Sequence, residues 1–430
     1  MRKHKRETEI NPEENITEFP LDEIVRKGAQ QMLEKALETE VDSFLGRYQY
    51  ILDDGGRRQV VRNGYKPARR IVTGAGQLDI HQPRIDDRIL EKHGEVRFKS
   101  SLIPPYLRRT KNVNELLPVL YLKGISTGDF TEALQALLGK EVIGLSPETI
   151  VRLKQVWQKD YEEWAKRDLS ETRYVYWWVD GIYFNVRLED ERQCILLIMG
   201  AKEDGSKELV AMEDGFRESK ESWCSMLRDL KRRGLKEGPK LATGDGALGF
   251  WTALLEEFPK TGHQLCWVHK TANVLDKLPT SLQPKAKQMI HDIYLAPTRM
   301  DAGVAFDVFI EEFEAKYPKA VDSLRNHRDD LLRFYDYPAE HWHHLRTTNP
   351  IESTFATVRL RTKRTKGCGS RMATLTMVFK LAQSAEKRWR RLRGCRKMKD
   401  VLAGILYRDG KRMEPRKSME LEAVDLPNAV

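Results

Sequence analysis

Hydrophobic residues recur at two different spacings along this chain, and the changes between them divide it into segments. From Leu21 to Phe44 they fall mostly three, four or seven positions apart, which predicts an amphipathic helix. Between Arg58 and Leu107 short β-prone pieces alternate with turn signals such as Asn63-Gly64, which predicts a small basic module of strands. From Asn112 to about Trp164 the helical spacing returns.

Three helical segments are expected in this third region. Ser126 and Ser146 suit N-cap positions, and Pro147 suits the first position of a helix. The spacing is typical of a helix-turn-helix unit, whose last segment would present Arg152 and Lys154 to a DNA groove. A plain three-helix packing unit fits the same pattern equally well.

A β-rich region follows a polar stretch that ends near Thr172. Its first part predicts an antiparallel meander of three strands, Tyr174–Leu188, Gln193–Gly200 and Glu208–Met212. The pattern then alternates helix, strand, helix and strand, over Ser219–Arg233, Lys240–Thr243, Ala247–Phe258 and Gln264–Val268. Together these elements predict a mixed sheet with helices packed on its faces.

From Asp276 to Leu345 only helical patterns occur, and a long basic, helix-rich region follows. We therefore expect an α/β fold, and a chain of this length favours several domains. The expected divisions are an N-terminal helix and small basic module at 1–110, a helix-turn-helix-like DNA-binding region at 111–170, an α/β core at 171–275 and 346–400, an all-helical insertion at 276–345, and a C-terminal tail at 401–430.

The composition is that of a globular protein with an ionised surface. Hydrophobic residues make up 40% of the chain and charged residues 32%, without an apolar run long enough to cross a bilayer. The basic start, Met1–Arg6, precedes acidic residues rather than an apolar stretch, so it does not resemble a secretory signal. Five scattered cysteines argue against a disulfide framework. These features predict a cytoplasmic protein with no membrane partner.

The positive charge is concentrated late in the chain. The net charge is +10, yet Arg359–Lys399 holds 15 Lys or Arg and one acid, Glu386, so this stretch alone carries +14 and the remainder −4. Such a localised excess is expected of a surface that binds a polyanion such as nucleic acid. The candidate phosphate contacts are Arg359, Arg361, Lys363, Arg364, Lys366, Arg388, Arg390 and Arg391.

Three carboxylates occupy positions where a cation site is expected. Asp180 interrupts an otherwise apolar strand, where a buried carboxylate needs a hydrogen-bond partner or a cation, although a bulge at Gly181 would also explain it. Asp245 ends a short strand just before a helix, and its alternative role is a helix N-cap. Glu352 fits the third position of a helix capped by Asn349, a geometry that would also aim its carboxylate.

Two Asp on neighbouring strands and a Glu from a following helix would form an oxygen-rich site suited to Mg²⁺ or Mn²⁺. A pair of such ions activates the attacking oxygen and stabilises the leaving oxygen in phosphoryl transfer. Asp180, Asp245 and Glu352 are therefore the candidate catalytic and metal-binding residues.

Several sequence strings, in order, resemble the mutator-type transposases of bacterial insertion sequences. They are Trp178–Arg187, Gly244–Trp251, Gln264–His269 and Thr347–Ser353, supported upstream by Arg62–Tyr65, Gln82–Arg84, Tyr106–Arg109 and Gly124–Thr127. The resemblance spans roughly Leu21 to Arg396. Two positions depart from the family pattern, since Asn185 stands where a Lys is frequent and Phe355 where an Asn is frequent.

The resemblance implies a ribonuclease-H-like catalytic core interrupted by an all-helical insertion, with an Asp-Asp-Glu triad at Asp180, Asp245 and Glu352. It also implies double-stranded DNA as the partner, both terminal inverted repeats and target, and a homo-oligomer assembled on it. Cys266 and His269 match a Cys/His pair that recurs near the start of the insertion, and we expect a structural or DNA-positioning role. A zinc site would need further ligands.

Two other functions remain compatible with the sequence. A nuclease of the same fold would hydrolyse DNA without joining it. A DNA-binding repressor, or a domesticated transposase, would use the three carboxylates only as helix caps.

Overall fold

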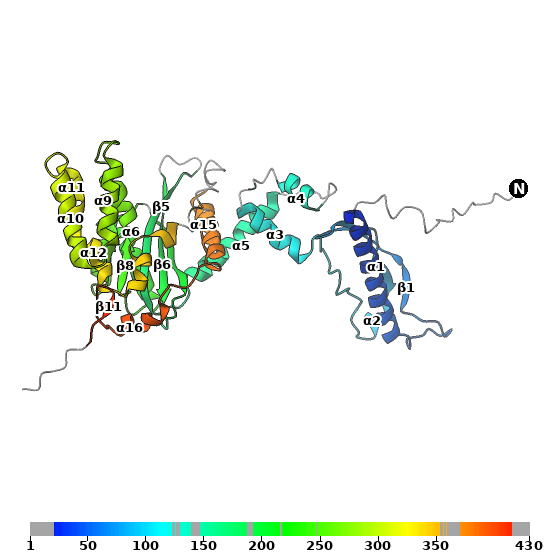
Figure 1. The fold of residues 1–430 in the computed structure, drawn as a ribbon. Coiled ribbons are helices and arrows are strands. Elements are labelled where there is room, and N and C mark those ends of the chain that lie inside the picture. Colours follow the sequence, from blue (N-terminus) through cyan, green and yellow to red (C-terminus); the bar gives the residue numbers. More distant parts are fainter. Residues whose placement is uncertain are drawn as a thin grey trace, which may run out of the picture. The chain divides into compact units, whose positions relative to one another are not determined.

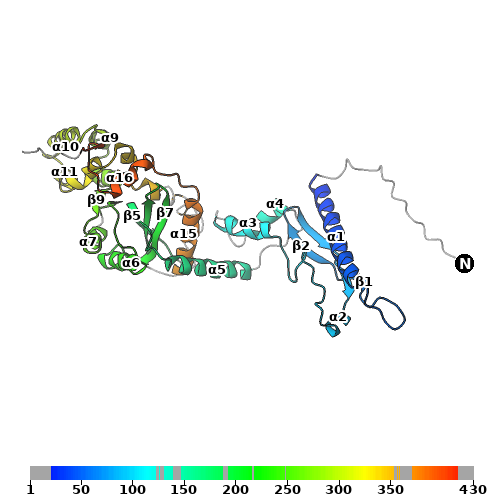
Figure 2. The same ribbon diagram turned by 90° about the horizontal axis from the view of Figure 1, so that it is seen from below.

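The computed structural model describes residues 21–122, 125, 130–138, 147–186, 192–215, 217–246, 248–352, 356, 358 and 370–414. The chain divides into two compact units, Met1–Leu153 and Lys154–Val430, and both combine helices with strands (Figures 1 and 2). The expectation of a mixed α/β protein is confirmed. Within the described ranges, no helix is both long enough and apolar enough to span a membrane.

In the first unit one long helix packs on short strands. α1 (Leu21–Arg47) buries side chains three and four positions apart, at Leu37, Val41 and Phe44, as its amphipathic pattern predicts. Two antiparallel strand pairs follow, β1 (Val61–Tyr65) with β4 (Pro83–Asp86) and β2 (Arg69–Thr73) with β3 (Gly76–Ile80), and then the short helix α2 (Ile89–Lys92). The predicted helix and the predicted module of strands are both confirmed.

Three helices complete the region that leads to the sheet, namely α3 (Lys111–Leu122), α4 (Phe130–Leu138) and α5 (Pro147–Ala165). Leu117 of α3 and Leu134 of α4 are buried in one small cluster. α5 begins at Pro147 as predicted, because the first position of a helix tolerates the missing N–H of proline. Ser126 and Ser146, the predicted caps, lie outside the described residues.

A five-stranded mixed sheet forms the centre of the second unit. Its strands are β5 (Tyr174–Phe184), β6 (Gln193–Lys202), β7 (Lys207–Gly215), β8 (Leu241–Gly244) and β9 (Gly262–Leu265). They lie in the order β7-β6-β5-β8-β9. β5, β6 and β7 are antiparallel neighbours, whereas β5, β8 and β9 are parallel, so the predicted meander and mixed sheet are confirmed.

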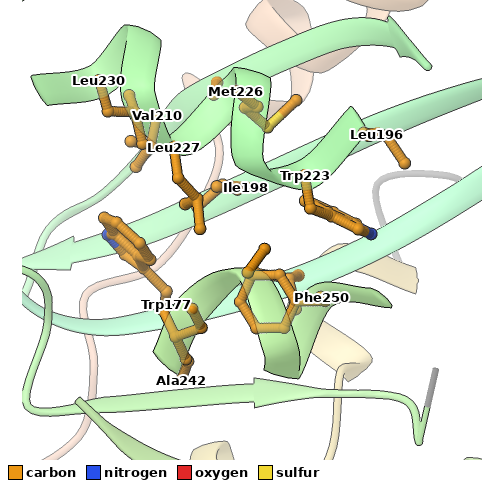
Figure 3. Packing of buried hydrophobic residues seen from close by; sticks show 14 of the residues in the cluster. Trp177, Leu196, Ile198, Val210, Trp223, Met226, Leu227, Leu230, Ala242 and Phe250 are labelled. Carbon is orange, nitrogen blue, oxygen red and sulfur yellow. The ribbon is translucent and has the colours of Figure 1, made fainter. Parts of the chain in front are cut away.

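Two helices, α6 (Lys220–Arg232) and α7 (Leu248–Glu257), cover one face of this sheet (Figure 2). Alternation along β5 sends Trp177 and Val179 into the core between sheet and helices. Figure 3 shows Trp177, Ile198 and Leu227 meeting in this core. The rings of Trp223 on α6 and Phe250 on α7 pack edge to face, with centroids 4.9 Å apart, and this contact stabilises the packing of the two helices.

The side chains that alternate with these, such as Tyr176 and Trp178, meet a helical region. It comprises α8 (Trp267–Leu275), α9 (Gln283–Leu295), α10 (Arg299–Phe313), α11 (Pro318–Arg325), α12 (Arg328–Leu332), η1 (Arg333–Asp336), η2 (Ala339–His341) and α13 (Trp342–Leu345). The Tyr176 hydroxyl lies 2.8 Å from His341 Nδ1, and Trp178 Nε1 donates to the His344 carbonyl at 2.8 Å. The predicted absence of strands between 276 and 345 is confirmed, since every one of these residues is described.

The predicted strand Gln264–Val268 needs correction. β9 ends at Leu265, Cys266 occupies the N-cap position, and α8 begins at Trp267. Trp267 is buried at the start of α8, and an apolar residue is equally expected in a buried strand, so its apolar character did not distinguish the two. The helical region therefore starts nine residues earlier than Asp276, its expected start.

The predicted basic, helix-rich region is only partly helical among its described residues. α15 (Arg371–Glu386) ends before the densest basic run, and the chain continues through η3 (Cys395–Lys397), α16 (Met398–Leu402) and the strand pair β10 (Tyr407–Arg408) and β11 (Lys411–Arg412). Like charges one turn apart destabilise a helix, which favours an end at this point. Arg388, Arg390 and Arg391 follow the helix and are exposed.

Candidate active site

Asp180 is the seventh residue of β5 and is half-buried. The pairing of β5 with β6 is regular from Tyr176 to Phe184 and places Asp180 opposite Leu197, so the alternative of a bulge at Gly181 is wrong. Asp180 Oδ1 accepts a hydrogen bond from Gly181 N at 2.9 Å. The strand therefore holds one carboxylate in an otherwise apolar and aromatic run.

Asp245 directly follows β8, the parallel neighbour of β5. Trp178 pairs with Thr243 in this ladder, and two positions further along each strand come Asp180 and Asp245. The two carboxylates are thus brought to the same end of adjacent parallel strands, where open α/β sheets bind their ligands. The next residue, Gly246, is not helical, so Asp245 is not at the N-cap position of α7.

The segment before Glu352 is tied to the same end of the sheet by main-chain hydrogen bonds. Trp267 N donates to the Arg346 carbonyl at 2.9 Å, and the Thr243 hydroxyl donates to the Leu345 carbonyl at 3.1 Å. Thr348 N lies 3.3 Å from Cys266 Sγ. These contacts attach the end of the helical region to β8 and to the start of α8.

Residues 349–352 are helical, and the cap of this turn is Thr348 rather than the predicted Asn349. The Thr348 carbonyl accepts from Ile351 N and Glu352 N, at 2.8 and 3.1 Å. With Thr348 as the cap, Glu352 is one position further into the helix than expected. The Thr348 hydroxyl donates to Glu352 Oε1 at 3.1 Å, so the cap still orients the Glu352 carboxylate.

Cys266, His269 and Glu352 form one group, with ligand atoms all within 4.8 Å of one another. His269 Nε2 lies 3.7 Å from Glu352 Oε1. Contact with the Cys266 thiol, together with the negative charges of Asp245 and Asp180, raises the pKa of His269 to about 9. Burial raises the pKa of Cys266, but the neighbouring His269 and Thr348 outweigh it and the net shift is downward.

Asp180 and Asp245 are not members of that group, which is the only set of three candidate ligands at such distances among the described residues. The structure thus brings Glu352 to the predicted Cys/His pair, and brings the two Asp to neighbouring positions on the sheet. A tetrahedral zinc site would need a fourth ligand in addition to these three.

Two charged residues that the sequence did not single out also belong to this region. The Glu218 carboxylate lies against Gly181, and burial, together with the charges of Asp180 and Asp245, raises its pKa. Lys270 is buried on α8, where burial lowers its pKa and the charge of Asp245 opposes that shift. Neither residue had a signal in the sequence, since Glu218 stands among helix-capping residues and Lys270 in a helical pattern.

Comparison with known proteins identifies the family. The family model described as "Transposase, Mutator family" matches residues 1–392. This chain belongs to that family.

The curated relatives of this Mutator-family chain carry corresponding names. It is 54% identical over 302 residues to the transposase for insertion sequence element IS6120 of Mycolicibacterium smegmatis, covering 70% of this chain and 93% of the relative. It is 50% identical over 286 residues to the transposase for element IST2 of Acidithiobacillus ferrooxidans, covering 65% of this chain and 94% of the relative. The transposase for IS256 in transposon Tn4001 of Staphylococcus aureus is 28% identical over 311 residues, which cover 71% of this chain and 76% of the relative.

The structure locates only part of the predicted DNA-contacting set of this Mutator-family chain. On α5, Arg152 is exposed and Lys154 is half-buried. Arg388, Arg390 and Arg391 are exposed after α15. The remaining five lie outside the described residues, namely Arg359, Arg361, Lys363, Arg364 and Lys366.

Proposed function

We propose that this chain is the transposase of an insertion sequence, which binds the terminal inverted repeats and catalyses metal-dependent DNA strand cleavage and strand transfer. One observation carries the proposal. Asp180 and Asp245 lie at neighbouring positions on parallel strands, and the Glu352 segment is hydrogen-bonded to the same end of the sheet. In a chain of the Mutator family, that arrangement fits an Asp-Asp-Glu site.

The sheet order supports a ribonuclease-H-like catalytic core. Three antiparallel strands in sequence, followed by two parallel strands on the other side of the first, give β7-β6-β5-β8-β9. The helices α8 to α13 stand between β9 and Glu352, where an all-helical insertion in such a core would be expected. These helices account for the long separation in sequence between Asp245 and Glu352.

The donor set suits Mg²⁺ or Mn²⁺, because both ions prefer carboxylate oxygens. Asp180, Asp245 and Glu352 would hold the ions, with the Thr348 hydroxyl fixing the orientation of Glu352. When bound, a pair of such ions makes water a better nucleophile at neutral pH and stabilises charge on the attacking and leaving oxygens. Strands and a capped helix end provide rigid positions for these ligands.

The chemistry proceeds in two displacements at one site. In the first, a water oxygen attacks phosphorus at the element end, the bond from phosphorus to the 3′-oxygen breaks, and that oxygen leaves as a 3′-hydroxyl. In the second, the freed 3′-hydroxyl attacks a phosphorus of target DNA and displaces a 3′-oxygen there. Two element ends have to be processed together, so we expect a homo-oligomer on double-stranded DNA.

Substituting each carboxylate tests this function. We expect Asp180→Asn, Asp245→Asn and Glu352→Gln each to reduce cleavage of DNA carrying an element end by more than about a hundredfold. Binding of that DNA should stay close to wild type, because none of the three contacts phosphate in the proposed role. Glu237→Gln, at an exposed position in the loop before the amino end of β8, is the matched control and should cleave normally.

The products separate this function from its two rivals. Joined products between element ends and target exclude a pure nuclease, which would yield only hydrolysed ends. Unchanged cleavage in all three variants would contradict the triad. End binding without cleavage in the wild type would favour a repressor in which the carboxylates serve only the fold.

A further inference from the structure

A fourth carboxylate, that of Glu218, lies against the main chain of β5 beside Asp180. A Cβ atom at Gly181 would lie 2.3 Å from Glu218 Oε1 and 2.4 Å from Cδ, distances that no real Cβ shows. A side chain at position 181 would therefore displace this carboxylate from its position. The Asp180-Gly181 pair thus provides one acid and the space for another.

The position of Glu218 is set by three elements. Ser219, the next residue, caps α6, and its hydroxyl accepts from Ser222 N at 3.2 Å. On the other side α7 approaches so closely that a Cβ at Gly249 would lie 2.4 Å from the Glu218 carbonyl oxygen. The Tyr183 side chain of β5 lies close enough to the Glu218 carboxylate to lower its pKa. The side chain is therefore half-buried and held in place.

Capping of α6 does not account for this placement, because the Ser219 hydroxyl already fills that role. A partly buried carboxylate among other carboxylates is unfavourable unless a proton or a cation compensates it.

We propose that Glu218 is a ligand of the same cation site and holds a divalent ion together with Asp180. This inference rests on the proposed function, since it assumes that Asp180, Asp245 and Glu352 bind the metal. It adds a residue to that site, and it gives Gly181 a role as the position that must lack a side chain.

The test measures cation binding as well as cleavage. The full chain is titrated with Mn²⁺, and the free ion is followed by its electron paramagnetic resonance signal. Glu218→Gln, which keeps the size but removes the charge, should weaken Mn²⁺ binding by about tenfold or more and raise the Mg²⁺ concentration needed for half-maximal cleavage. Glu221→Gln, an exposed acid in the first turn of α6, is the matched control and should bind Mn²⁺ as wild type does.

Gly181→Ala is the second variant, because its methyl group displaces the Glu218 carboxylate without changing any charge. It should weaken Mn²⁺ binding as Glu218→Gln does, and it decides the matter if circular dichroism shows that Glu218→Gln does not fold. Wild-type Mn²⁺ binding by Glu218→Gln and Gly181→Ala, with reduced binding by Asp180→Asn, would overturn the role of Glu218 alone. Wild-type Mn²⁺ binding by Asp180→Asn as well would overturn the proposed metal site itself.

Discussion

Thr348 connects the fold to the proposed chemistry through one buried hydroxyl. This residue is fully buried, and its hydroxyl lies 3.1 Å from Glu352 Oε1 and 3.4 Å from Cys266 Sγ. Valine has nearly the same shape but cannot donate a hydrogen bond. The orientation of Glu352 therefore depends on a group that valine removes.

We expect Thr348→Val to reduce cleavage of element-end DNA by about tenfold. The lost hydrogen bonds should lower the free energy of unfolding by about 1 kcal/mol, measured in urea. Thr348→Ser keeps the hydroxyl and should restore most of the activity. Equal cleavage by the Val variant and the wild type would show that Glu352 does not need this donor.

His341 is a second buried polar residue whose bonding can be worked out from its partners. Its Nε2 lies 3.0 Å from the Gly394 carbonyl, which can only accept, so Nε2 carries the proton. Nδ1 is then the acceptor for the Tyr176 hydroxyl at 2.8 Å. Both ring nitrogens of the neutral imidazole are satisfied, and burial lowers the pKa of His341.

The lowered pKa of His341 predicts acid sensitivity. The unfolded chain binds the proton more readily than the folded chain, so the stabilising contribution is complete above the ordinary pKa, about 6.5. It is lost as the pH falls from there toward the folded pKa, by at most about 1.4 kcal/mol per pH unit. We expect His341→Gln to flatten the fall in unfolding free energy between pH 7 and pH 5. His343→Gln, at an exposed position, should leave that slope unchanged.

At the scale of elements, α15 joins the sheet to α5. Phe379 of α15 packs against Tyr161 and Trp164 of α5, with ring centroids 5.4 and 4.9 Å apart. Arg371, at the start of α15, forms an ion pair with Asp214 of β7 at 2.6 Å. Phe379 is fully buried, so its aromatic contacts contribute more stability than the partly exposed ion pair.

Phe379→Ala should therefore lower the free energy of unfolding by about 3 to 5 kcal/mol. The cause is the loss of buried aromatic contacts and the cavity that remains between α15 and α5. Urea unfolding followed by tryptophan fluorescence measures the change. Phe379→Leu fills most of the space and should cost less, whereas equal losses in the two variants would mean that aromatic volume is not what holds α15.

The periodicity of the chain predicted most elements, because burial imposes a period on each helix and strand. The strands β5, β6 and β7 and the helices α6 and α7 were found in this way. The errors lie where two elements join. Trp267 is apolar in a strand or a helix, and Thr348 and Asn349 both suit an N-cap, so only tertiary contacts decide between the alternatives.

The residues of the candidate site also differ in whether local sequence patterns could predict them. Asp180 and Asp245 could be predicted because each polar residue interrupts or ends an apolar strand. The Glu218 carboxylate could not, since its importance depends on a glycine 37 residues earlier in the chain. A contact of this kind is fixed by sheet topology, which local patterns do not specify.

At the scale of the whole molecule, part of the excess positive charge lies on an exposed segment, Lys387–Arg393, which we call the basic segment. One residue anchors it, because the Leu392 side chain is buried and Leu392 N donates to the Gly205 carbonyl at 2.9 Å. Its charged residues are exposed, namely Lys387, Arg388, Arg390, Arg391 and Arg393. An anchored segment presents these charges without the entropy cost of ordering a free chain.

If the basic segment grips DNA phosphates, its contribution must depend on salt. Each neutralised phosphate releases condensed counterions, so each lost contact lowers the slope of log affinity against log salt by about 0.9. Changing Arg388, Arg390 and Arg391 together to alanine should lower the slope by up to about 2.7 and weaken binding to all DNA sequences alike. Fluorescence anisotropy over a range of salt concentrations measures both effects.

The matched control removes three exposed lysines from the helical region instead, Lys287, Lys316 and Lys319. The net charge then changes equally in the two triple variants, so a general effect of charge would lower both slopes alike. A reduced slope in the basic-segment variant alone would place phosphate contacts at Arg388, Arg390 and Arg391. Equal slopes in wild type and that variant would show that DNA does not reach this surface, and the predicted contacts would then have to lie elsewhere in the chain.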